Sequence, residues 1–242
     1  MGRMDVYQIH EIEDLVKGNS YVGRGIVIGR SADARQAVIA YFIMGRSRNS
    51  RNRIFTLRDG GLYTEPFDAA LVEDPSLIIY AAVRACGEHL VVTNGDQTDT
   101  VVSFLEQGRT FGEALETREF EPDRPNWTPR ISGMVTFRDR DFSYQMNILK
   151  SADAEGTACC RFNFSYPALA GTGHFLHTYV CDGAPIPTFQ GEPERVAIPD
   201  SIDELTDRLW TSLDEDNRIS LYVRYTDLET RAVTERLINK NQ

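Results

Sequence analysis

The chain has 242 residues, of which 41% are hydrophobic and 26% are charged, so it can bury a sizeable core and is not largely disordered. Its formal net charge of −10 argues against nucleic acid as a partner, because sequence-neutral nucleic-acid binders are usually basic. No stretch approaches the roughly 20 apolar residues of a membrane span, and the N-terminal segment lacks the apolar region of a secretory signal. The four cysteines include no C-x-x-C pair, so we expect a cytoplasmic protein with reduced thiols. Because the chain lacks a long apolar stretch, we expect no membrane partner.

The first half of the chain is predicted to consist mainly of strands. A lead-in over residues 1–20 contains one helical turn near residues 12–16. Apolar runs then predict strands at 22–28, 38–44, 53–57, 77–83 and 90–93. The run 38–44 is nearly continuous, which is typical of a strand covered on both faces.

Two helices are predicted next, followed by a loop. Thr98 or Asp99 is expected to cap the first helix, which ends at Gly108. Thr110 and Glu113 have the spacing of a capping box for the second helix. Residues 119–130 contain three prolines and are therefore predicted to form a stiff loop.

The second half repeats the strand-rich pattern. Strands are predicted at 131–137, 142–149, 158–164, 174–181 and 219–225. Residues 183–199 form a proline-rich connector, and Ser201 and Glu204 have capping-box spacing before an amphipathic helix. Residues 232–238 are either a strand or a short helix. We expect a single α+β domain over 1–242, with 194–242 as a C-terminal helix and strand extension.

An arginine-rich segment is the densest candidate for a binding site. The chain holds 23 Arg and only three Lys, and eight of the arginines lie between positions 24 and 58 with a single acid, Asp33. Guanidinium groups pair bidentately with phosphate, so this segment favours an anionic ligand. The alternative is a solvated turn in which Asn and Ser interleave with Arg.

Two further segments could contribute polar groups. Residues 93–99, TNGDQTD, link a buried strand to a helix start and could form a polar pocket or merely a helix cap. Within the loop 119–130, residues 121–123 and 126–130 carry two carboxylates, Glu121 and Asp123, and Arg130, and could hold a site rigidly or serve only as structure. His174 and His177 lie three apart in a predicted strand, on opposite faces, so a metal site is not expected.

Several short motifs follow one another along the chain: Tyr21-Val22-Gly23-Arg24, Tyr41 with Arg46-Ser47 and Asn52-Arg53, Val91 through Asp99, Thr128 through Gly133, Gly171 through His174, and Pro187 through Pro193. Together they resemble the motifs of the archaeal-type IMP cyclohydrolases. Their order agrees with that family from about Tyr21 to Pro193.

This resemblance implies a fold, a reaction and a ligand. The fold is that of the N-terminal nucleophile hydrolases, a four-layer αββα sandwich of mainly antiparallel sheets. Residue 2 is Gly, so a nucleophile-type amidohydrolase is not expected. The implied reaction closes 5-formamidoimidazole-4-carboxamide ribotide to IMP with loss of water, in purine biosynthesis. No cofactor or metal is expected; the implied partner is the small-molecule purine ribotide, and homo-oligomerisation is left open.

The residue patterns and the resemblance together predict the site residues. Glu121 is the first choice for proton transfer, with Tyr41 and Tyr80 as rivals and Asp96 as a further candidate. The predicted substrate-binding residues are Arg24, Arg46, Ser47, Asn52, Arg53, Asn94, Thr98 and Arg130. The alternative function is a non-catalytic or repurposed purine-ribotide binding protein on the same scaffold.

Overall fold

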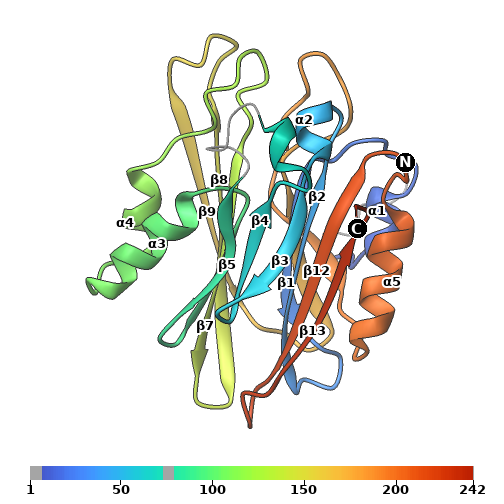
Figure 1. The fold of residues 1–242 in the computed structure, drawn as a ribbon. Coiled ribbons are helices and arrows are strands. Elements are labelled where there is room, and N and C mark those ends of the chain that lie inside the picture. Colours follow the sequence, from blue (N-terminus) through green and yellow to red (C-terminus); the bar gives the residue numbers. More distant parts are fainter. Residues whose placement is uncertain (1–6, 73–78, 242) are drawn as a thin grey trace, which may run out of the picture.

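The structure is a computed structural model that describes residues 7–72 and 79–241, and its strands form two antiparallel sheets (Figure 1). The first sheet contains β1 (Arg24–Arg30), β2 (Gln36–Met44), β10 (Thr172–His177), β11 (Glu194–Ala197), β12 (Arg218–Asp227) and β13 (Val233–Asn239). Its strand order is β11-β10-β1-β2-β12-β13.

The second sheet runs along the chain in nearly sequential order. It contains β3 (Ile54–Arg58), β4 (Gly61–Glu65), β5 (Tyr80–Cys86), β6 (His89–Thr93), β7 (Arg130–Arg138), β8 (Asp141–Ser151) and β9 (Cys159–Pro167). Its strand order is β3-β4-β5-β6-β7-β8-β9, so each strand pairs with its neighbours in sequence. The predicted α+β class with mainly antiparallel strands is confirmed.

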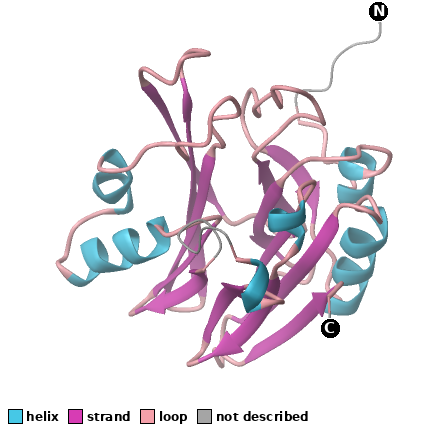
Figure 2. Ribbon diagram, turned by 45° about the horizontal axis from the view of Figure 1, so that its top comes forward, coloured by secondary structure: helices cyan, strands magenta, loops and turns pink. Residues whose placement is uncertain are grey.

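Helices lie on the outer faces of both sheets (Figures 1 and 2). Helices α1 (Ile12–Val16) and α5 (Ile202–Ser212) pack on the first sheet, and α3 (Gln97–Glu106) and α4 (Phe111–Glu116) pack on the second. The short α2 (Arg48–Arg51) joins β2 to β3, and a 3-10 turn covers Ala69–Leu71. None of the helices in the described residues is long and apolar enough to cross a membrane.

The largest core lies between the two sheets, and β2 contributes side chains both to it and to the core under α1 and α5. Ile39, Tyr41 and Ile43 face this inter-sheet core, whereas Val38 and Phe42 on the opposite face pack under α1 and α5. Alternate side chains of a strand point to opposite faces, so a continuous apolar run can serve two cores at once. Each such side chain contributes roughly 1.5–3 kcal/mol on burial.

The structure corrects several local predictions. Helix α3 begins at Gln97 after Asp96, so Thr98 and Asp99 lie in its first turn and do not cap it. The capping box of Thr110 and Glu113 is confirmed. At α5 only half of the predicted box forms, in which the Ser201 side chain accepts from the Glu204 N–H.

Other differences concern the strands. Strands β4 and β11 were not predicted, because a short segment between turns and a proline-rich connector both carry weak strand patterns. The predicted strand 77–83 begins outside the described residues and continues to Cys86. Residues 232–238 form a strand. Strand β12 pairs with β2 along Gln36–Met44, so the predicted C-terminal extension contributes to the first sheet.

Candidate active site

One end of the inter-sheet space opens into a cavity of about 230 Å³. Five of the residues predicted from the sequence line it, namely Arg24, Arg46, Ser47, Arg53 and Glu121. They come from β1, from the segment between β2 and β3, and from the loop 119–130. The structure thus brings together groups that are up to about a hundred residues apart in the sequence.

Backbone geometry at Gly23 places Arg24 in this cavity. Gly23 has φ +80°, and a Cβ there would lie 2.0 Å from Thr178 Oγ1. The same Thr178 hydroxyl accepts a hydrogen bond from the Arg24 N–H at 3.1 Å. Only glycine tolerates both the positive φ and the close approach, so the motif residue Gly23 has a direct physical role.

Arg24 and Arg53 are buried cations without a direct partner. Their relative exposures are 7% and 5%, and neither guanidinium has a hydrogen bond or ion pair to any residue in the described ranges. Arg24 Nε, Arg53 Nε and Arg53 Nη1 are all buried and unsatisfied. Buried donors without acceptors are unfavourable, so this arrangement favours binding of an anionic or oxygen-rich ligand.

Glu121 supplies the negative charge beside these arginines. Its relative exposure is 4%, and its carboxylate makes no hydrogen bond or ion pair within the part of the chain that the structure describes. Burial raises the pKa of Glu121, and the charges of Arg24 and Arg130 offset only part of that effect. A carboxyl group with a raised pKa can exchange a proton near neutral pH.

Tyr41 and Tyr80 form a buried pair behind the cavity. Their hydroxyl oxygens are 2.9 Å apart, and neither residue lines the cavity itself. Burial, followed by the neighbouring Tyr80, raises the pKa of Tyr41 well above its ordinary value. Tyr41 therefore remains protonated, which disfavours it as a general base.

The rim of the cavity is held by Arg46 and Ser47. Arg46 forms an ion pair with Asp182 and donates to the Gly183 carbonyl at 2.9 Å. Its guanidinium lies 5.1 Å from the centre of the Tyr21 ring. The side chain of Ser47 accepts from the Ser50 N–H at the start of α2. The predicted arginine-rich segment thus contains a short helix, α2, and the hydrogen bonds and ion pair of Arg46 and Ser47 fix the edge of the cavity.

The predicted residues of the turn 93–99 do not line this cavity. Asn94 accepts hydrogen bonds from the Ile131 N–H at 2.9 Å and the Gln97 amide at 3.0 Å, and it donates to the Pro129 carbonyl at 2.9 Å. The Thr98 hydroxyl lies 2.7 Å from that of Thr93. These hydrogen bonds join the end of β6 to the start of β7 and to α3, which is a structural role.

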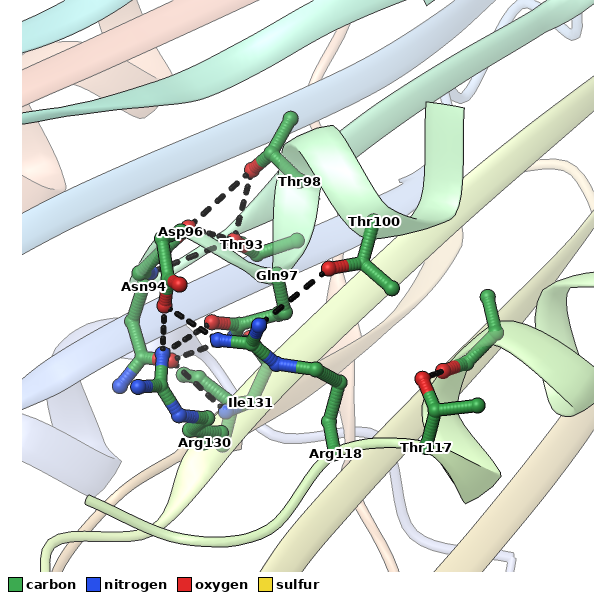
Figure 3. A network of polar contacts seen from close by, with 12 residues as sticks. Thr93, Asn94, Asp96, Gln97, Thr98, Thr100, Thr117, Arg118, Arg130 and Ile131 are labelled. Carbon is green, nitrogen blue, oxygen red and sulfur yellow. Dashed lines mark hydrogen bonds and ion pairs between the residues drawn. The ribbon is translucent and has the colours of Figure 1, made fainter. Parts of the chain in front are cut away.

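Asp96 belongs to the same network (Figure 3). It pairs with Arg118 at 2.5 Å and Arg130 at 2.6 Å. Burial raises the pKa of Asp96, but the hydrogen bond and charge of Arg118 and those of Arg130 outweigh it and hold the pKa below its ordinary value. Asp96 is thus a paired carboxylate, unsuited to proton transfer near neutral pH. Arg130 is occupied by Asp96 and Gln97, although its charge still acts on Glu121.

Asn52 is likewise structural. Its side-chain amide donates to the Asp68 carbonyl at 2.8 Å and accepts from the Asp68 N–H at 2.7 Å. This two-point contact fixes the chain after β4 to the chain before β3. Asn52 does not line the cavity.

Sequence reasoning did not single out several cavity residues. Asn49 and Ser50 lie within the predicted arginine-rich segment, and Asp123, Asn126 and Thr128 lie within the predicted loop. Tyr21 belongs to a motif used for the resemblance. Tyr179 and Ile186 have no local signal, because they follow β10 and reach the cavity only through the fold.

The two histidines of β10 have separate environments. His174 lies 2.6 Å from the Tyr144 hydroxyl, whereas His177 lies 3.2 Å from Glu194. No group of three or more His, Cys, Asp or Glu suited to a metal ion occurs in residues 7–72 and 79–241.

The profile of the IMP cyclohydrolase-like protein family matches residues 21–231. The chain belongs to this family. The match includes every residue that lines the cavity.

Individual proteins that are similar to this chain carry the same family name. A protein of Methanopyrus kandleri named IMP cyclohydrolase is 34% identical over 146 residues, which is 56% of this chain and 72% of the relative. IMP cyclohydrolases of Methanothrix thermoacetophila and Halobacterium salinarum are 33% and 34% identical over 122 and 119 residues. These two matches cover 49% and 48% of this chain, and the chain spans 59% and 57% of the length of those two relatives.

Proposed function

We propose that this chain is an IMP cyclohydrolase, which closes 5-formamidoimidazole-4-carboxamide ribotide to IMP with release of water. The observation that carries the proposal is the pair of buried guanidinium groups of Arg24 and Arg53, which lie in one cavity with Glu121 and have no hydrogen-bond or ion-pair partner among the described residues. Membership of the family supports the same activity. The two sheets with helices on both outer faces support the αββα sandwich expected from the resemblance.

The chemistry needs the residue types found in the cavity. The carboxamide nitrogen attacks the formyl carbon, a C–N bond forms, and the formyl oxygen develops negative charge. The C–O bond then breaks as water leaves, and the two protons of that water come from the carboxamide nitrogen and from the formamido N–H, whose loss leaves the C=N bond of the closed ring. Arg24 and Arg53 offer N–H donors for the developing oxyanion or for the 5′-phosphate. Glu121 can accept the proton lost by the nitrogen as the adduct forms and return a proton to the departing oxygen.

The walls of the cavity can also orient the two reacting groups of the substrate. Holding the carboxamide nitrogen against the formyl carbon lowers the barrier by up to roughly 7–11 kcal/mol in favourable intramolecular reactions. Arg46 at the rim is held by Asp182 and stacks on Tyr21, so the rim offers a third cation at a defined position.

An ultraviolet assay of IMP formation from the formylated ribotide tests the proposal. Steady turnover that is lost in Glu121→Gln is the expected result. If the protein binds IMP tightly but forms none, the alternative holds, and the chain is a purine-ribotide binding protein. Neither binding nor turnover would reject both functions.

A further inference from the structure

A chain of three side chains forms one wall of the cavity. The Tyr179 hydroxyl lies 2.5 Å from Thr128 Oγ1. Thr128 Oγ1 in turn donates to Asp123 Oδ2 at 2.5 Å, and the Thr128 N–H donates to Asp123 Oδ1 at 2.6 Å. All three residues line the cavity, and Thr128 is only 2% exposed.

The protons in this chain can point in only one direction. A carboxylate accepts hydrogen bonds and donates none, so the single Thr128 hydroxyl proton is directed to Asp123. The Thr128 oxygen can then only accept from Tyr179, whose single proton is directed to Thr128. The Tyr179 oxygen is left with accepting capacity alone.

The surroundings of Tyr179 hold its ring in place. It stacks on Tyr21 with ring centroids 5.7 Å apart, and the charge of Arg24 acts on its hydroxyl. Arg24, Arg46 and Arg53 supply the cavity with N–H donors. Tyr179 therefore adds a neutral acceptor at a fixed position in a cavity rich in cations.

We infer that Tyr179 is a specificity-determining residue, which accepts a hydrogen bond from an N–H or O–H of the bound ribotide, and that Thr128 and Asp123 are positioning residues that set its proton. The inference rests on the proposed purine-ribotide ligand. It assigns a role to a residue that lies outside the motifs of the sequence analysis.

Calorimetric titration of IMP into Tyr179→Phe tests the inference. This substitution retains the ring and its stacking, and removes only the hydroxyl. We expect IMP to bind about tenfold more weakly, the usual size of one lost hydrogen bond. Tyr225→Phe is the matched control, because Tyr225 donates to the Pro199 carbonyl and does not line the cavity. The control should bind IMP as the wild type does.

The positioning residues are tested by a pair of variants. Thr128→Val cannot accept the Tyr179 proton, so the phenol is free to rotate and present a donor; the affinity for IMP should fall by a factor similar to that of Tyr179→Phe. Thr128→Ser retains the hydroxyl and should recover most of the lost affinity. Equal affinity in Thr128→Val and the wild type would contradict the proton order.

Analogues of IMP identify the donor. 2′-Deoxy-IMP, 3′-deoxy-IMP and 1-methyl-IMP each lack one donor, and the analogue that lacks the donor bound by Tyr179 should bind the wild type and Tyr179→Phe equally. If the substitution weakens all three by the same factor as IMP, or weakens none, Tyr179 accepts no hydrogen bond from the ligand. Wild-type protein that binds IMP without forming it would reject the proposed catalysis and leave this test valid. Wild-type protein that binds no IMP would reject the ligand class and the inference together.

Discussion

Arg24 and Arg53 place two like charges in one buried cavity, and burial together with the charge of Arg24 lowers the pKa of Arg53. Burial also lowers the pKa of Arg24, but the negative charge of Glu121 and the nearby tyrosines outweigh it, so its pKa lies above the ordinary value. The cavity thus holds two buried guanidinium groups and one buried carboxyl group, Glu121. An anionic ligand relieves this imbalance, and we expect IMP to raise the melting temperature of the protein.

The contribution of the second arginine can be measured directly. Arg53→Ala should weaken IMP binding by about 1.5–3 kcal/mol, because one charge-assisted contact is lost. Isothermal titration calorimetry gives this value. Arg58→Ala is the matched control, since Arg58 pairs with Glu65 on the surface and should leave the affinity unchanged. Unchanged affinity in Arg53→Ala would remove Arg53 from the site.

Glu121 is predicted to transfer the proton. Glu121→Gln keeps the size of the side chain and removes its basicity, so kcat should fall by roughly 10²–10⁴ while KM changes little. The ultraviolet assay measures both constants. A loss of less than tenfold would transfer the role to another group.

The same substitution should alter stability in a pH-dependent way. Since burial raises the pKa of Glu121 in the folded state above the ordinary 4.5, the folded protein binds more protons than the unfolded chain between the two values, and stability falls as pH rises through this window. Glu121→Gln removes this loss. Urea unfolding should therefore show equal stability of the two proteins at pH 4 and a more stable variant at pH 8. A stability difference that does not depend on pH would contradict the raised pKa.

Asn94 is predicted to matter for folding and not for binding. Asn94→Ala removes three buried hydrogen bonds, to Ile131, Pro129 and Gln97, and should lower the free energy of unfolding by roughly 1–3 kcal/mol. The affinity for IMP should remain within about twofold of the wild type, a difference of about 0.4 kcal/mol. Gln107→Ala is a suitable control, because its side-chain amide donates to the hydroxyl of the exposed Ser103. A large loss of affinity with unchanged stability would instead place Asn94 at the ligand.

Local chemistry in the sequence was sufficient for much of the fold. The capping box of Thr110 and Glu113 depends only on residues three apart, and the doubly covered strand β2 follows from its continuous apolar run. The glycine at position 23 of the first motif is also explained locally, because its φ is positive and favours glycine. Such features could be read directly because their partners lie nearby in the chain.

The tertiary structure decided how each polar group is used. Asn94, Asp96 and Thr98 are as polar as Arg24 and Glu121, yet the pairing of β6 with β7 places acceptors and donors around the first three. Within residues 7–72 and 79–241, Arg24 and Arg53 have no such partners, and both line the cavity. Tyr179 reaches this cavity through strand pairing between distant segments, and no local pattern carries that information. The sequence by itself determined which residue types were available, and long-range packing decided which of them were left free for a ligand.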